Sequence, residues 1–298
     1  MKQFISKRCL QYILFAVIAS IWFLYYTFPA EEFANHLENI ADRSGLGYTL
    51  TIDRVKPSFP ATILLTGCRV LEKNREGNDV FEAEEIRLTP KIWSIINGTK
   101  RFVFDCRAYN GRIHGSMLFK EKIPGPFDSE IELEAIDLGV YQGLLKEVSY
   151  RLAGILNGNI TYNGRSGSAT GASGKAVMKL TDSRIQLSQP FFDAGSMNLK
   201  DITLEMTLNQ EKMTTEIEML AGDLQGRLSG TVVLRKDLLQ SSLTLRGMIE
   251  PTDEFLRENP GLRDSLQLIS SRRASNRGGK QFNLTVSGTL RELRYTLT

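Results

Sequence analysis

The chain has 298 residues, of which 42% are hydrophobic and 24% are charged. This balance is typical of folded proteins and excludes a largely disordered chain. The net charge of +3 is too small to predict binding to nucleic acid. The length allows one large domain or two ordinary ones.

An uncharged apolar segment runs from Leu10 to Phe28 near the N-terminus. As a helix it would be roughly 28 Å long, close to the hydrocarbon thickness of a bilayer. A cleaved signal peptide is the alternative, but the apolar run is long for one, and cleavage after Ala30 would place bulky Phe28 where a small residue is needed. We therefore expect residues 1–30 to contain an uncleaved transmembrane anchor. Its candidate membrane residues are Leu10, Phe15, Trp22 and Phe28.

The charges beside this segment predict its orientation. Three basic residues precede it and two acidic residues follow it, namely Lys2, Lys7, Arg8, Glu31 and Glu32. Basic residues favour the cytoplasmic side of a membrane. We expect a single-pass protein with a cytoplasmic N-terminus and with the rest of the chain outside the cytoplasm.

Short helices and a series of strands are expected next. Apolar residues at helical spacing predict an amphipathic helix over Glu31–Arg43. A second short helix is expected over Pro90–Asn97, with Ile92, Trp93 and Ile96 turned inward. Alternation of apolar and polar residues predicts strands over Gly47–Val55, Ala61–Leu71, Val80–Leu88, Phe102–Tyr109, Gly111–Phe119 and Glu130–Leu138.

The last of these strands has a row of acidic residues on one face, namely Glu130, Glu132 and Glu134. Aliphatic residues alternate with them on the other face. A carboxylate row can bind a cation, but a solvated strand face explains the pattern more simply. No metal site is therefore predicted here.

The middle of the chain is expected to be less regular. A helix is predicted over Gly139–Leu152, and Gly164–Gly174 is rich in glycine and serine. A phosphate-binding loop requires a fixed glycine spacing and a lysine followed by serine or threonine, but here Lys175 is followed by Ala176. We expect a flexible loop that separates a first half, residues 31–163, from a second half, residues 175–298.

The second half has the clearest strand pattern. Strands are predicted over Asp201–Asn209, Met213–Met219, Asp223–Leu234, Ser241–Gly247, Phe282–Leu290 and Glu292–Leu297, with short helical pieces over Pro251–Ser271. The third of these strands contains the sequence Gly226-x-Leu228-x-Gly230, and similar glycine pairs begin at Gly111 and Gly154. Glycines within strands mark bends or close approaches of two backbones.

These elements predict a mainly β fold, in which an N-terminal transmembrane helix is followed by a curled, largely antiparallel sheet and a few short helices. The helices are too few to cover the apolar face of the sheet, so the sheet is expected to curl over that face as an open groove or half-barrel. Such a groove could hold an acyl chain or a partner's apolar strand. Its candidate lining residues are Ile202, Leu204, Met206, Leu208, Leu228, Val232, Leu243 and Leu245.

The sequence offers little material for catalysis. The two histidines, His36 and His114, are far apart, and we find no nucleophile–base pair, metal cluster or phosphate loop. We therefore expect neither enzyme activity nor a cofactor. Cys68 and Cys106 lie in predicted strands, where they are either buried thiols or a disulfide in an oxidising compartment.

Several segments resemble the type II secretion system protein GspN family, which is itself similar to the AsmA/TamB-like envelope proteins. They are LTDSRIQLSQP, DITLEMTLN, LAGDLQGRLSGTVVL, SSLTLRGMIEP and FNLTVSGTL in the second half, and IWSIINGTKRFVFDCRAYNGRIHGSM in the first. The resemblance runs along the whole chain. One departure is Arg291, which follows the terminal Gly-Thr-Leu where many AsmA-like chains have a proline.

The resemblance implies a bitopic inner-membrane protein of a Gram-negative bacterium, with a β-groove in the periplasm and no catalytic residue. The leading hypothesis is a non-catalytic component of type II protein secretion, with secretion-system or envelope proteins as partners. The alternative hypothesis is an AsmA/TamB-like module that binds or transfers lipids and holds phospholipid acyl chains. Nucleic acid is not an expected partner under either hypothesis.

Overall fold

The computed structural model describes residues 7–43, 47–59, 61–73, 79–96, 98–120, 125–141, 148, 150–165, 168–191, 194–235, 237–272 and 281–297. The helices are α1 (Lys7–Tyr26), α2 (Ala30–Arg43), α3 (Ile92–Ile96), α4 (Asp253–Glu258) and α5 (Pro260–Arg272), with a 3-10 turn, η2, at Leu238–Gln240. The strands are β1 (Tyr48–Ser58), β2 (Thr62–Glu72), β3 (Asp79–Pro90), β4 (Lys100–Ala108), β5 (Gly111–Phe119), β6 (Pro126–Asp137), β7 (Tyr150–Arg165), β8 (Ser168–Phe191), β9 (Ala194–Asn209), β10 (Lys212–Gly222), β11 (Leu224–Val233), β12 (Ser242–Pro251), β13 (Phe282–Thr289) and β14 (Leu293–Leu297).

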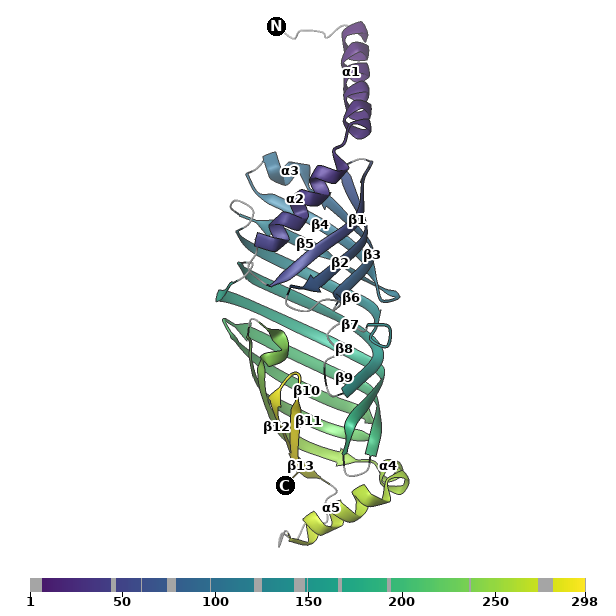
Figure 1. Cartoon of the computed structure of the whole chain (residues 1–298), viewed down its shortest axis with the longest axis vertical. Coiled ribbons are helices and arrows are strands. Elements are labelled where there is room, and N and C mark those ends of the chain that lie inside the picture. Colours follow the sequence, from purple (N-terminus) through teal and green to yellow (C-terminus); the bar gives the residue numbers. More distant parts are fainter. Residues whose placement is uncertain are drawn as a thin grey trace.

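The fourteen strands form one sheet in which each strand pairs with the next one along the chain. Every pairing is antiparallel. Figure 1 shows the strands stacked along the long axis of the molecule, with α1 at one end and α4 and α5 at the other. The predicted mainly β, antiparallel fold is confirmed, and the sheet is open, with β1 and β14 as its edges.

One register position carries an apolar residue or a glycine in every strand of the sheet. We call this set the apolar row; it consists of Val55, Leu65, Ile86, Cys106, Ile113, Leu133, Gly158, Met178, Leu204, Ile217, Leu228, Gly247, Leu284 and Leu297. The adjacent register position points to the opposite face and is mostly polar, with Asp105, Glu132 and Glu205 among its members. We call the face with the apolar row the inner face and the other the outer face.

Each end of the inner face is buried in a core of its own. The N-terminal core comprises Val55, Leu65, Cys68, Ala83, Cys106 and Ala108. The C-terminal core comprises Met197, Leu199, Met219, Leu224, Leu228, Val232, Leu243, Leu245, Ile249, Phe255, Leu262, Leu266 and Phe282. Partly buried residues of both β8 and β14 pack against the C-terminal core, so the sheet curls around it.

α2 closes the N-terminal end of the inner face, and its predicted extent is confirmed. Phe33, Ala34 and Leu37 pack against the N-terminal core. Glu38 Oε1 accepts a hydrogen bond of 3.0 Å from the backbone N–H of Ile52 in β1. The helix therefore both covers the core and satisfies a donor on the edge strand, which would otherwise be open to pairing with another chain.

The apolar N-terminal segment is helical, as α1, and carries exposed aromatic side chains such as Phe15 and Trp22. Among the described residues, no helix has the combined length and apolar character needed to cross a membrane. Leu10 lies in α1. Phe28 follows α1 and is half-buried against the N-terminal core, with its ring centroid 5.7 Å from that of Phe33. Phe28 thus belongs to the folded sheet domain rather than to the exposed part of α1.

The predicted irregular middle of the chain is wrong in two places. Residues 142–147 and 149 of the predicted helix lie outside the described residues, but its last residues, from Tyr150 on, belong to β7. The predicted flexible loop is mostly strand, because β7 continues to Arg165 and β8 starts at Ser168. Ser173 pairs with both β7 and β9, so backbone hydrogen bonds on both sides hold a sequence whose glycines and serines suggested flexibility.

The predicted orientation of α3, the short helix after β3, is also wrong. Ile92 and Trp93 of α3 are 55% and 81% exposed, although the sequence pattern predicted that both turn inward. The side chain of Ile96 lies outside the described part of the chain. A five-residue helix has too few turns to define a buried face, so its apolar residues need not point at the sheet.

The glycines of the predicted repeat allow neighbouring strands to approach closely. Gly247 lies opposite Leu228, and Gly230 lies opposite Leu245, so each glycine faces a leucine across the ladder. A Cβ atom on Gly247 would overlap the carbonyl oxygen of Arg227, and one on Gly230 would overlap that of Thr244. Leucines therefore lie opposite glycines on the inner face of the curled sheet, where there is little room for side chains.

Gly247→Ala should lower the free energy of unfolding by about 1–3 kcal/mol, because the added methyl group must displace backbone rather than a mobile side chain. Denaturation in urea, monitored by circular dichroism of the backbone, measures the change in the free energy of unfolding. Gly195→Ala is the matched control, since a Cβ atom there meets nothing within 4 Å. Equal stability of the two variants would contradict the close strand approach.

Candidate functional site

A second row on the inner face extends the apolar surface beside the apolar row. It consists of Ile63, Leu88, Phe104, Gly115, Ile131, Ile160, Ala176, Met206, Thr215, Gly230, Leu245, Val286 and Tyr295. Thr215 is the only member whose side chain is mainly polar. Apart from Thr215, the inner face is thus apolar over a width of at least two residues across the sheet.

The middle of this surface lies outside both cores, although Ala176 and Leu180 of β8 are buried there. We define the central trough by six residues of β6–β9, namely Ile131, Leu133, Ile160, Met178, Leu204 and Met206. All six are half-buried, and none belongs to the N-terminal or the C-terminal core. α2 packs on one core, and α4 and α5 contribute to the other, so the trough lies between the two covered ends.

An aromatic ladder follows one side of the inner face across four strands. The ring centroids of Phe102 and Phe119 are 6.2 Å apart, those of Phe119 and Phe127 are 5.4 Å apart, and those of Phe127 and Tyr162 are 5.5 Å apart. Burial raises the pKa of the Tyr162 phenol, as expected for a hydroxyl held beside apolar surface. The ladder joins β4 to β7 and gives the trough a rigid aromatic margin.

The predicted lining residues divide into two groups. Ile202, Leu204, Met206 and Leu208 lie on β9 and are half-buried. The other four, Leu228, Val232, Leu243 and Leu245, lie on β11 and β12 and are buried within the C-terminal core. All eight share the inner face; Ile202 also packs against the C-terminal core, whereas Leu204, Met206 and Leu208 belong to neither core.

The sequence analysis missed the β6–β8 half of the trough. Leu133 and Met178 belong to the apolar row next to Leu204. The residues around Leu133 do alternate, but the acidic residues between the aliphatic ones predicted only a solvated face and not the lining of a groove. For Met178, the preceding glycine- and serine-rich sequence hid the strand.

Polar groups on the inner face are few. Ser129 and Thr215 are both buried, and the Thr215 hydroxyl has no hydrogen-bond partner among the described residues. A buried hydroxyl without a partner is costly, about 1–3 kcal/mol. The inner face of the described strands therefore presents mainly apolar side chains.

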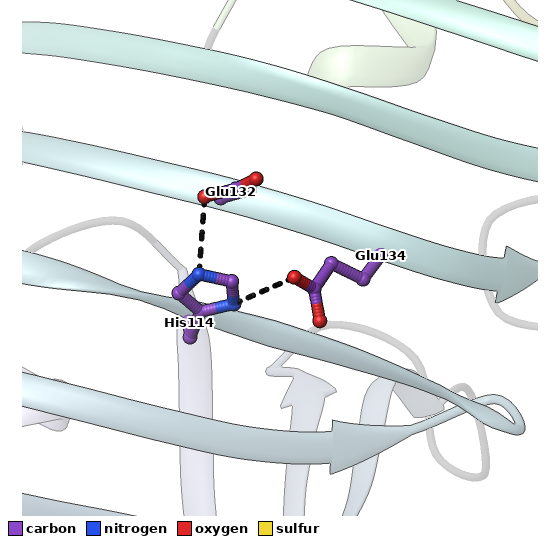
Figure 2. Close-up of side chains that lie close together, drawn as sticks. All are labelled: His114, Glu132 and Glu134. Carbon is purple, nitrogen blue, oxygen red and sulfur yellow. Dashed lines mark ion pairs between the residues drawn. The ribbon is translucent and has the colours of Figure 1, made fainter.

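The outer face has the opposite character. Its acidic and basic side chains form exposed ion pairs, such as Arg227 between Glu216 at 3.5 Å and Glu218 at 2.6 Å. His114, Glu132 and Glu134 also meet on this face (Figure 2) and are the described residues that could share a metal ion. The predicted carboxylate row is therefore an exposed face, but two of its members come together with a histidine.

The two strand cysteines are free thiols, so the disulfide alternative is wrong and buried thiols are present instead. Cys68 lies opposite Ala83 of β3, and Cys106 lies opposite Ile86 of the same strand. With one strand between them, and with partners three residues apart along that strand, their Cα atoms are at least two strand spacings apart, roughly 10 Å, which exceeds the ~7 Å that a disulfide spans.

No protein-family model, curated protein or solved structure matches the chain. The resemblance to the GspN family and to AsmA/TamB-like proteins therefore stays a prediction.

Both thiols should be unreactive in the folded protein, because burial raises the pKa of Cys68 to about 11 and that of Cys106 to about 12 and thiolate is the reactive form. In a Cys9→Ser variant, Ellman's reagent should detect no fast-reacting thiol before denaturation and two after it. Fast labelling of the native chain would contradict the buried N-terminal core.

Proposed function

We propose that this protein is a non-catalytic binder of apolar ligands and that the central trough holds the acyl chains of lipids. The observation that supports this most is the apolar row, which crosses all fourteen strands while its middle lies outside both cores. A sheet that needed only a core would be expected to cover this surface with helices or with its own strands.

The dimensions of the trough are suitable for an acyl chain. From β6 to β9 there are three strand spacings, about 14 Å. An acyl chain spans one leaflet, roughly 15 Å or half of the ~30 Å hydrocarbon core. Each methylene removed from water contributes about 0.8 kcal/mol when fully buried, so partial burial of a whole chain is enough for stable binding.

Met178→Asp should abolish lipid retention, because it places a carboxylate in the middle of the trough. Val177→Asp is the matched control, since Val177 is the next residue on β8, faces outward and is 37% exposed. The full chain would be purified in mild detergent, and the phospholipid per chain would be measured by mass spectrometry. Equal lipid in both variants, or no lipid in the wild type, would refute the proposal.

Membrane attachment through α1 is part of the same proposal. Phe15, Trp22 and Tyr26 are 71%, 72% and 82% exposed, and aromatic side chains of this kind favour the membrane interface. α3, with the exposed Ile92 and Trp93, lies at the same end of the molecule as α1 (Figure 1). The single-pass topology, the cytoplasmic N-terminus and the location in a bacterial inner membrane stay predictions.

Trp93 should lie at the membrane surface if this end of the sheet meets the bilayer. In a Trp22→Phe variant, Trp93 is the sole tryptophan, and brominated lipids in reconstituted vesicles should quench its fluorescence. Unquenched emission would place α3 away from the bilayer. A chain that remains soluble after membranes are sedimented would reject attachment altogether.

A second candidate function is an accessory role in type II protein secretion, as the resemblance implies. Its structural support is the edge strand β14, which pairs with β13 and ends the sheet. An edge strand can receive a strand of a partner protein. At the other edge, by contrast, Glu38 of α2 already occupies a backbone donor of β1.

Deletion of the gene should then trap type II substrates in the periplasm, as measured by immunoblotting of periplasmic and culture fractions. Complementation with Met178→Asp separates the two functions, because an edge-strand role does not need the trough. Full export in the deletion strain would exclude the secretion role. Export restored by wild type but not by Met178→Asp would tie secretion to the trough.

A further inference from the structure

Three side chains with metal-binding atoms meet on the outer face near the middle of the sheet (Figure 2). His114 lies on β5 directly opposite Glu132 of β6, and Glu134 is two residues further along β6. His114 Nε2 is 3.1 Å from Glu132 Oε2, and His114 Nδ1 is 3.9 Å from Glu134 Oε1. One ligand atom from each residue lies within 4.8 Å of the others.

Other charged side chains of the outer face surround this cluster. Neighbouring carboxylates have cationic partners: Asp105 pairs with Arg112, and Glu85 pairs with Arg87 at 2.7 Å. Hydrogen bonds from Arg112 hold the pKa of Asp105 below its usual range. Glu132 and Glu134 both lie beside His114, and Glu134 also lies directly opposite Arg112, with which it interacts electrostatically.

The imidazole of His114 is also incompletely satisfied. Its Nδ1 atom is shielded from solvent and has no hydrogen-bond partner among the residues described. A divalent cation could bind one ring nitrogen together with an oxygen of each carboxylate.

We propose that His114, Glu132 and Glu134 form a binding site for a divalent transition metal, with Zn²⁺ as the best match. One imidazole nitrogen and two carboxylate oxygens, with water in the fourth position, are a ligand set that zinc accepts. Ligands about 2.1 Å from a tetrahedral zinc are roughly 3.4 Å apart, close to the 3.1 Å between His114 Nε2 and Glu132 Oε2. The Glu134 side chain is 48% exposed and can rotate to complete the set.

Such a site would join β5 to β6 on the face opposite the central trough. These strands connect the N-terminal core, against which Ile113 of β5 packs, to the middle of the sheet. The metal therefore acts as a structural cross-link. This inference does not depend on the proposed lipid binding or on membrane attachment.

Isothermal titration of ZnCl₂ into the tag-free, metal-stripped full chain in detergent tests the site. We expect one zinc per chain at this site and a rise in the thermal unfolding midpoint on zinc addition. His114→Ala and Glu132→Gln should each weaken binding by more than the roughly 10- to 100-fold that loss of an outer-shell partner costs. In both variants the zinc-dependent rise in the midpoint should disappear.

Two control variants make the result specific. His36→Ala removes the other histidine of the chain, which is exposed on α2. Glu216→Gln removes an outer-face carboxylate that pairs with Arg227. Both should bind zinc like the wild type. The proposal is overturned if the wild type binds no zinc, if His114→Ala binds as well as wild type, or if the controls lose binding equally.

Discussion

The constraint that shapes this molecule is the need to remove one apolar face of a fourteen-stranded sheet from water with very little helix. Apolar surface contributes roughly 25 cal/mol per Å² when it is buried, so an uncovered sheet of this size would be unstable. α2 covers one end, and α4, α5 and the curled C-terminal strands cover the other. Coverage therefore stops short of the middle, and the uncovered middle is the candidate site.

Curling and glycine placement are two parts of one solution. A sheet that bends over its inner face crowds the side chains there. Pairs such as Leu228 and Gly247 relieve the crowding, because a large side chain on one strand lies opposite a glycine, which has no side chain, on the next. The repeated glycine pattern of the sequence thus has a packing origin and requires no ligand to explain it.

Much of the fold could be predicted from period-two alternation. The hairpin strand Gly111–Phe119 was predicted with its observed limits, and β11 was predicted to within one residue at each end. In the same half, however, β8 was not predicted, and β9 begins at Ala194 rather than at Asp201. The predictions failed where composition conflicted with pairing. Ser168–Gly174 is too small and polar to read as a strand, yet its backbone hydrogen bonds with β7 and β9 make it one.

The candidate site was only half predictable. The β9 residues were visible because Leu204 and Met206 alternate with polar neighbours. Leu228 and Val232 show the same alternation, but they are buried in the C-terminal core. A local pattern shows which residues share a face of the sheet, but it does not show whether other elements cover that face. The meeting of His114 with Glu132 and Glu134 depends on the register of β5 with β6, and no local pattern encodes that register.

Photo-crosslinking along β9 tests the central claim most directly. Benzophenone side chains would be placed singly at positions 202 to 208 of the membrane-attached full chain, and transfer of radiolabelled phospholipid would be measured after illumination. We expect lipid adducts at 202, 204, 206 and 208, which share the inner face, and none at 203, 205 and 207. Equal adduct formation at odd and even positions, or no adduct at any position, would contradict an acyl chain bound to the inner face.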